Sequence, residues 1–195
     1  MKTRWLTFIL IVLFFNISIV SADENDNYAK TVKTFKESPV VKPFFSNCYG
    51  YAVFPTIGKG GIGIGGAHGS GQVYQAGKLT GKTSMTQVTV GFQFGGQAFS
   101  QIIFFEDERA YKEFTSGEFE FGAQASAVAI TAGAQAKAGT GGATAGATAK
   151  GDAGKQADVS YQKGMVVFTH AKGGLMYEAS IGGQAFGFEP IKEGE

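Results

Sequence analysis

Glycine is the residue type that most constrains how this chain can fold. Thirty of its 195 residues are glycine, whereas only four are proline. Glycine weakens helix interiors but is useful at bends, bulges and close backbone contacts, so this content disfavours a helical bundle. Hydrophobic residues make up 44% of the chain, which is enough to build a packed core. We therefore expect one folded unit dominated by β-structure.

The charge of the chain is nearly balanced. Lysine and arginine together number 17, against 16 aspartates and glutamates. A protein that binds nucleic acid through its overall field needs a clear excess of basic residues. We expect no nucleic-acid partner, and any charge-driven binding must be local.

The first 22 residues have the order of a secretory signal peptide. Lys2 and Arg4 form a basic start, residues 6–20 are mostly apolar, and small residues lead to Ala22. Such an apolar run is shorter than the roughly 20 residues that span a bilayer. We expect cleavage after Ala22, a single domain over residues 23–195, and an exported, periplasmic protein peripheral to a membrane. The only cysteine, Cys48, excludes an intrachain disulfide and its role is open.

After this leader, residues 27–38 are predicted to form a short helix that ends before Pro39. At about 100° per residue, its apolar side chains share one narrow face and its lysines follow along one flank. The apolar residues are Tyr28, Val32 and Phe35, and the lysines are Lys30, Lys33 and Lys36. The predicted helix is amphipathic and basic on one side.

The rest of the chain reads mainly as strands separated by glycine. Residues 77–81 resemble a hairpin connection, and the apolar residues of 85–105 alternate with polar ones, as in a strand with one buried face. Residues 106–117 read as a short helix with an acidic first turn. Further strands are expected over residues 51–54, 72–74, 119–130, 164–170 and 175–188.

Two segments leave the local structure open. Residues 131–155 are rich in glycine, alanine and threonine, and form either a mobile loop or small-residue strands. The sequence Gly-Gly-Gln-Ala-Phe occurs at 95–99 and again at 182–186, which suggests two glycine-bent strands of similar shape. The predicted fold class is α+β: a bent, antiparallel, glycine-rich sheet or partial barrel with short flanking helices.

Motifs for catalysis or cofactor binding are incomplete. The glycines of 58–66 match the spacing of a dinucleotide loop, but no helix is expected to follow them and no acidic residue occurs between Glu37 and Glu106. Cys48 with His68 or His170 lacks a recognisable catalytic context. We expect no enzyme activity, no cofactor and no metal site.

Several blocks of the sequence resemble the SYLF domain in their order and spacing. They are Tyr-Gly-Tyr-Ala-Val-Phe-Pro at 49–55, the glycine-rich residues 58–66, His-Gly-Ser-Gly-Gln-Val at 68–73, residues 91–100, and Lys-Gly-Gly-Leu-Met at 172–176. The resemblance implies a lipid-binding module. Eukaryotic members bind phosphoinositides partly through a basic amphipathic segment at the start of the domain, some also bind actin, and bacterial relatives are often exported.

In this chain the corresponding segment is the predicted helix at 27–38. From its pattern alone, the apolar face of this helix either packs on its own domain or contacts a membrane, and the two are compatible if the helix can detach. The resemblance implies that it contacts anionic phospholipid at an envelope membrane, with apolar side chains at the headgroup boundary and lysines on phosphates. Lys59 and Lys82, in glycine-rich stretches expected to be turns, are further candidates. The lipid-binding candidates are Tyr28, Lys30, Val32, Lys33, Phe35, Lys36, Lys59 and Lys82. The alternative is an exported structural or protein-interaction module without direct lipid binding, whose protein partner is unknown.

Overall fold

The computed structural model describes residues 20–122, 125, 127–130, 159–173 and 181–191. Most of the predicted signal peptide and all of the segment 131–155 lie outside these residues. The elements are α2 (Val20–Glu37), α3 (Phe44–Asn47), β1 (Gly50–Gln75), β2 (Lys78–Phe105), α4 (Glu108–Phe114), β3 (Phe119–Glu120), β4 (Val128–Ile130), β5 (Met165–Gly173) and β6 (Gln184–Pro190).

A long antiparallel hairpin of β1 and β2 is the centre of the fold. The strands pair from Gln75↔Lys78 at the turn to Gly50↔Phe105 at the far end, with three register shifts between. Ala76 and Gly77 form the connection with φ angles of 49° and 78°. Two positive φ values match the twist that a two-residue hairpin turn requires. The predicted hairpin is confirmed, but its connection is the two residues 76–77 and not 77–81, since residues 78–81 belong to β2.

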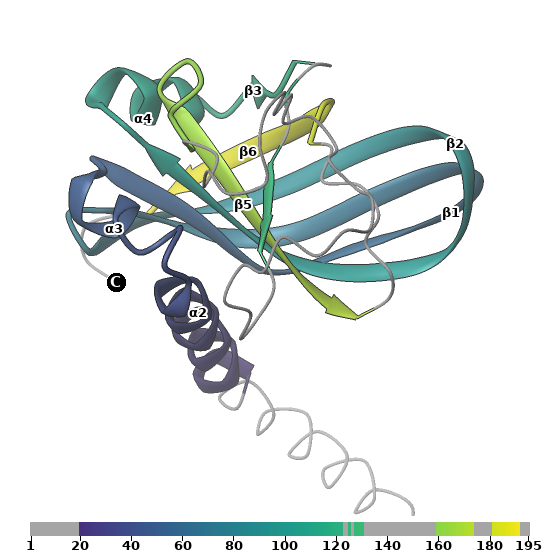
Figure 1. Ribbon diagram of the computed structural model, residues 1–195, viewed down its shortest axis with the longest axis horizontal. Coiled ribbons are helices and arrows are strands. Elements are labelled where there is room, and N and C mark those ends of the chain that lie inside the picture. The colour runs from purple at the N-terminus through teal and green to yellow at the C-terminus, as the bar shows by residue number, and fades with distance from the viewer. Residues whose placement is uncertain (1–19, 123–124, 126, 131–158, 174–180, 192–195) are drawn as a thin grey trace, which may run out of the picture.

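The other strands extend this hairpin into a six-stranded sheet within the described part of the chain. β6 pairs with the first half of β2, from Gly81↔Pro190 to Gln87↔Gln184, and β5 pairs with its second half. All these pairings are antiparallel, whereas β4 runs parallel to β5. Figure 1 shows the hairpin curling around, with β5 crossing it. The result is a curled half-barrel with a few helices, which confirms the broad α+β prediction.

Close contact between the two halves of β1 accounts for the curl. Tyr51 near its start stacks on Tyr74 near its end, with ring centroids 5.0 Å apart. A Cβ atom on Gly69 would lie 2.8 Å from the Thr56 carbonyl oxygen, and one on Gly71 would lie 2.6 Å from the Phe54 ring. These distances are shorter than van der Waals contact, so glycine is needed where the halves meet.

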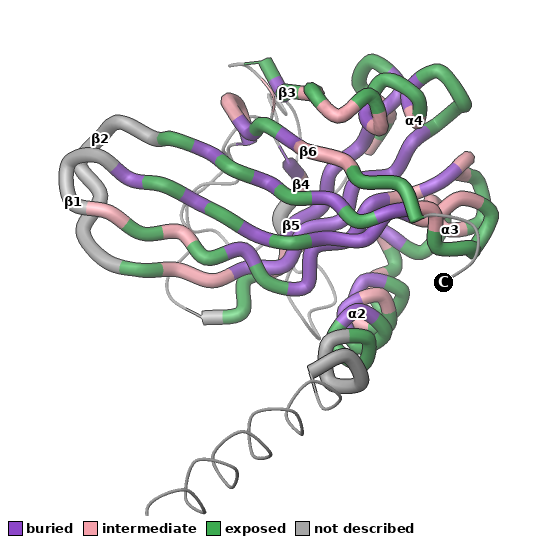
Figure 2. The backbone as a smooth tube through the Cα atoms, turned by 180° about the vertical axis from the view of Figure 1, so that it is seen from behind, coloured by how far each residue is buried: buried purple, intermediate pink, exposed green. Residues whose placement is uncertain are grey.

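The sheet has a hydrophobic cluster on each face. One cluster, which we call the inner cluster, includes Ile103 and Phe105 of β2 with Phe114 of α4. The other, which we call the outer cluster, includes Ile102 and Phe104 of β2 with Phe35 of α2. β2 is therefore buried on both sides near its end, whereas burial alternates in its first half, as Figure 2 shows. The two helices α2 and α4 cover opposite faces.

Several local predictions can be compared with the structure. The helix predicted at 106–117 is confirmed as α4, which is capped by Asp107: its side chain accepts a hydrogen bond from the Ala110 N–H at 2.8 Å. The prediction of two similar glycine-bent strands is wrong. Gly96 lies within β2, whereas Gly183, with a φ of 75°, belongs to the turn before β6. Within the strand expected at 119–130, the described residues form β3 and β4, and residues 123, 124 and 126 lie outside the described part. Of the strand expected at 175–188, residues 175–180 lie outside the described part and β6 begins at Gln184.

Candidate functional site

The predicted amphipathic helix lies within α2, which begins earlier, at Val20, and so is not short. Its apolar face packs against the sheet. Tyr28 is 4% exposed, Phe35 is fully buried, and Val32 is half-buried against the same outer cluster. Their spacing of three or four residues keeps them on one side of the helix. In this structure the side chains proposed to enter a membrane are therefore engaged by the domain itself, and inserting them requires α2 to detach.

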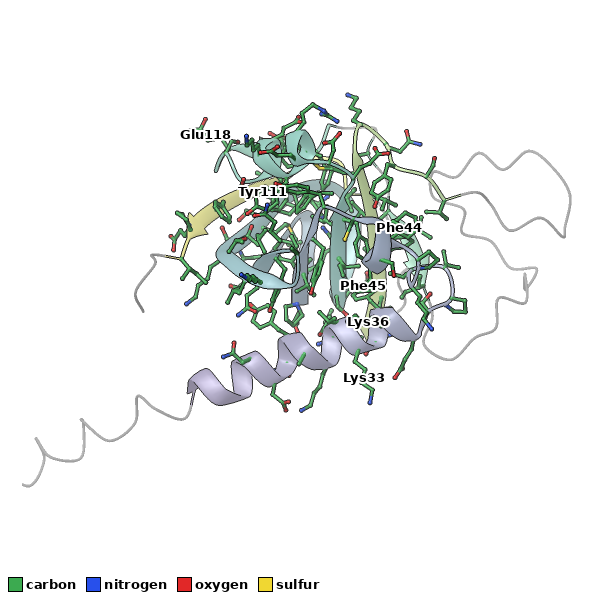
Figure 3. The ribbon with its side chains drawn as sticks, turned by 90° about the vertical axis from the view of Figure 1, so that its left-hand side faces the viewer. Lys33, Lys36, Phe44, Phe45, Tyr111 and Glu118 are labelled. Carbon is green, nitrogen blue, oxygen red and sulfur yellow. The ribbon has the colours of Figure 1, made fainter. Side chains whose placement is uncertain are left out.

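The lysines of α2 lie on its exposed side. The Lys30 ammonium is 2.5 Å from the Asp26 carboxylate one turn earlier. Among the described residues, neither Lys33 nor Lys36 forms an ion pair. Figure 3 shows Lys33 pointing away from the domain, whereas Lys36 lies beside Phe45. The lysines belong to the second half of the helix, while its acidic residues are concentrated in the first half.

A compact corner follows α2 and includes α3. Phe45 contacts Tyr51 and Phe104, with ring centroids 5.4 and 4.8 Å away. The Lys36 ammonium lies 5.1 Å from the Phe45 ring centroid, within range of a cation–π interaction. We name residues 39–47 the α3 corner. Sequence reasoning missed this part of the surface, although its mixture of proline, valine, lysine and phenylalanine is visible in the sequence.

The two remaining lysine candidates lie in strands, so their expected position in turns is wrong. Lys59 is half-buried in β1 and pairs with Gln97, whereas Lys82 is exposed in β2. Lys82 and Tyr28 border the same hollow, which has a volume of about 410 Å³. The hollow is also lined by Ser70, Gly71, Gln72, Thr83, Ser84, Gly117, Gly187, Phe188 and Glu189. The structure thus places Lys82 on the same hollow as Tyr28, in the middle of α2. Lys59 does not line this hollow.

Cys48 lies beside a group of tyrosines at the edge of the outer cluster. Burial raises the pKa of the Cys48 thiol above its ordinary value. Burial also raises the pKa of Tyr51 to about 12, with smaller contributions from Tyr74 and Cys48. The Tyr161 hydroxyl has no hydrogen-bond partner among the described residues, and burial is the main cause that raises its pKa to about 12. These groups are held in their protonated, uncharged forms at neutral pH.

The histidines have different environments. His68 Nδ1 lies 3.3 Å from the Thr86 hydroxyl across the hairpin. Burial, together with the charge of Lys172, lowers the pKa of His170.

Within the described part of the chain, no three His, Cys, Asp or Glu residues are grouped so that they could hold a metal ion. None of the helices in that part combines the length and apolar character needed to cross a membrane.

Comparison with protein families gives a match over residues 86–188, which run from β2 to β6 and make up just over half of the chain. The matched family is Ysc84, described as "Las17-binding protein actin regulator". A comparison with curated proteins gives no match. The matched region includes most of β2, all of β5 and most of β6, whereas α2 and β1 precede it. The chain therefore belongs to the Ysc84 family of SYLF-domain proteins.

Proposed function

We propose that this domain is a non-catalytic module that associates with anionic phospholipid at an envelope membrane. The observation that carries the proposal is the arrangement of α2: its apolar face is packed on the sheet, while Lys33 and Lys36 are exposed and have no ion pair among the described residues. Lysines held in this way can approach headgroup phosphates without unfolding the helix. Each contributes about 1 kcal/mol near a charged leaflet.

The position of these lysines along the helix supports the proposal. Lys36 lies in the last turn of α2, where the negative end of the helix dipole favours a cation. Three of the four acidic residues of α2 lie in its first half and the fourth, Glu37, lies next to Lys36, so the second half, the basic end of the helix, has a net positive charge. We infer that the basic end faces the lipid and that Lys30, which is bonded to Asp26, contributes less.

The environment of Cys48 argues against this residue as a catalytic nucleophile. A nucleophilic cysteine acts as its thiolate and needs a lowered pKa, whereas burial raises the pKa of this thiol.

The proposed location at an envelope membrane follows from the predicted signal peptide. N-terminal sequencing of the protein recovered after expression in a bacterium tests this point, with Asp23 as the expected first residue.

The second candidate is a protein-interaction module, and one structural observation favours it. Among the described strands, β1 pairs only with β2, so β1 forms an edge of the sheet along its length. An open strand edge can accept an extended segment of a partner. The family description also names binding to a protein.

Co-sedimentation with vesicles distinguishes the two candidates. The chain that begins at Asp23 is mixed with phosphatidylglycerol-rich or neutral vesicles at low and high salt. The leader is omitted because its apolar run at 6–20 would itself enter bilayers. We expect binding to the anionic vesicles alone, weakened by salt because exposed charges are screened.

The matched variants keep the net charge equal. Replacing Lys33 and Lys36 by glutamine should weaken binding by roughly 30-fold, from about 1 kcal/mol for each lysine. Replacing Lys78 and Lys163, which are exposed at other sites, should have little effect. Absence of binding to anionic vesicles would reject the lipid proposal and favour the protein-interaction module. Equal losses in the two double variants would show that only the total charge matters.

A further inference from the structure

The α3 corner combines exposed and firmly held side chains. Val41 is fully buried in the outer cluster, while Val40 and Phe45 remain partly exposed and Lys42 and Pro43 are exposed. The sequence after α2 therefore places apolar and basic groups together on the surface. This differs from α2 itself, whose large apolar side chains face the sheet.

The backbone of the corner is ordered by a series of short hydrogen bonds. The Lys42 N–H donates to the Ser38 carbonyl at 2.9 Å, and the Phe44 N–H donates to the Val41 carbonyl at 3.0 Å. The Phe44 ring lies 5.2 Å from Phe168 and 5.4 Å from Tyr161, so it ties α3 to β5 and the segment before it. The partly exposed side chains of the corner are thus held in place before any partner arrives.

The charges at the corner favour an anionic surface. Lys36 and Lys42 are exposed, and Lys33 lies one turn before Lys36 on the helix. Glu37 is the only acidic residue between positions 33 and 48, so this stretch has a net positive charge. Lysine beside apolar and aromatic side chains is the composition found where proteins meet the boundary between headgroups and acyl chains.

Another exposed apolar side chain, the most exposed of the large ones on the described surface, lacks this setting. Val88 is 70% exposed on the hairpin. Neither the stretch around it, residues 83–91, nor the facing stretch of β1, residues 61–71, contains a lysine or arginine. Val88 therefore offers an apolar surface of similar kind without the cations, and it serves as an internal control.

We propose that the α3 corner is the part of the domain that enters the headgroup region of an anionic bilayer. Val40 and Phe45 supply the apolar contact, and Lys36 and Lys42 hold the adjacent phosphates. Because the corner is already exposed, this contact needs no detachment of Tyr28 or Phe35 from the sheet. The inference rests on the proposed lipid binding and specifies which surface performs it.

Tryptophan fluorescence can locate the contact. The only tryptophan of the chain, Trp5, lies in the predicted leader, so a chain that begins at Asp23 has none. Phe45→Trp and Val88→Trp each introduce a single reporter. With phosphatidylglycerol vesicles, we expect the reporter at position 45 to shift to shorter wavelength and to be quenched by brominated lipid. The reporter at position 88 should change little.

Binding variants provide an independent test. Lys42→Gln should weaken binding to anionic vesicles by roughly fivefold, and Val40→Ser with Phe45→Ser by roughly tenfold or more, whereas Val88→Ser should bind as the unaltered protein does. Because Phe45 also packs on Phe104, far-ultraviolet circular dichroism and a thermal melt check that the double variant is folded. Lys42 is exposed, so its variant tests the corner without disturbing the core.

The outcomes separate this inference from the proposed function. If vesicles bind but the reporter at position 45 and the corner variants respond no more than those at position 88, the corner is not the contact and lipid binding still stands. If anionic vesicles do not bind the protein at all, both are overturned. A response confined to the corner supports both.

Discussion

Substituting Gly69 by alanine tests the close crossing that curls the hairpin. The added Cβ would lie 2.8 Å from the Thr56 carbonyl oxygen, 2.7 Å from Ile57 Cγ1 and 3.2 Å from Ile57 Cα. Two of these are backbone atoms, so relief requires the halves of β1 to move apart by several tenths of an ångström. Overpacking of this kind costs about 1–3 kcal/mol.

A second glycine in the same strand provides the control. A Cβ on Gly58 meets nothing within 4 Å, and neither Gly58 nor Gly69 has a left-handed backbone. Replacing glycine by alanine at a compatible site stabilises a protein by about 0.4–1 kcal/mol through the unfolded chain. We therefore expect Gly58→Ala to gain stability and Gly69→Ala to lose about 1–2 kcal/mol, a difference of about 2 kcal/mol between the variants.

Urea unfolding followed by far-ultraviolet circular dichroism measures this difference. With a slope of about 2 kcal/mol per molar urea, the midpoints of the two variants should be separated by roughly 1 M. Equal midpoints, or a more stable Gly69→Ala protein, would refute the reasoning, because they would mean that the two halves of β1 do not approach as closely as described.

Two further predictions concern the outer cluster. Phe35→Ala should reduce the free energy of unfolding by about 3–5 kcal/mol, because it empties a fully buried site between α2 and the sheet. The control Lys33→Ala, at an exposed site on the same helix, should change it by less than about 0.5 kcal/mol. Equal losses in a urea titration would contradict the packing of α2. Burial raises the pKa of Tyr51 and of Tyr161 to about 12, against an ordinary value of 10.0, so the folded state holds these protons more tightly than the unfolded chain does. The stability that this provides is fully present below pH 10 and is lost as the pH rises towards 12. Spectrophotometric titration of tyrosinate should show their ionisation shifted above that of the unfolded chain, and Phe variants at these two positions should remove that shift.

The hairpin and the helix after it could be predicted because their signals are local. The turn at Ala76 and Gly77 lies between strand-like residues, and the Asp107 cap precedes α4 directly. The three-residue to four-residue spacing of Tyr28, Val32 and Phe35 likewise indicated one apolar face.

What covers that face could not be predicted in the same way. Periodicity shows that Tyr28 and Phe35 share a side, but a membrane and a sheet are both apolar partners for it. The register that places Ile102 and Phe104 beneath α2 depends on contacts between residues far apart in the sequence. The same limit explains why Lys59 and Lys82 were expected in turns: glycine-rich segments can bend or can form strands that approach one another closely.

Buried polar residues within β2 depended equally on distant partners. Gln101 is fully buried, and its amide donates a hydrogen bond to the Gln184 side chain at 2.9 Å, while Gln184 donates in return at 3.3 Å. In the sequence Gln101 is simply a polar residue before an apolar run. Its partner lies 83 positions away, beyond the reach of local patterns.

The two-sided pairing of β2 also has a consequence for the order in which the chain folds. Pairing of β1 with β2 can begin at the turn, where Gln75 faces Lys78, and proceed towards Gly50 and Phe105 by short steps in sequence. β6 completes the sheet only after the chain has been extended to Pro190. Until then the first half of β2 has an unpaired edge that can recruit other strands. During synthesis from the N-terminus, this edge therefore stays open until residues 184–190 are available to pair with it.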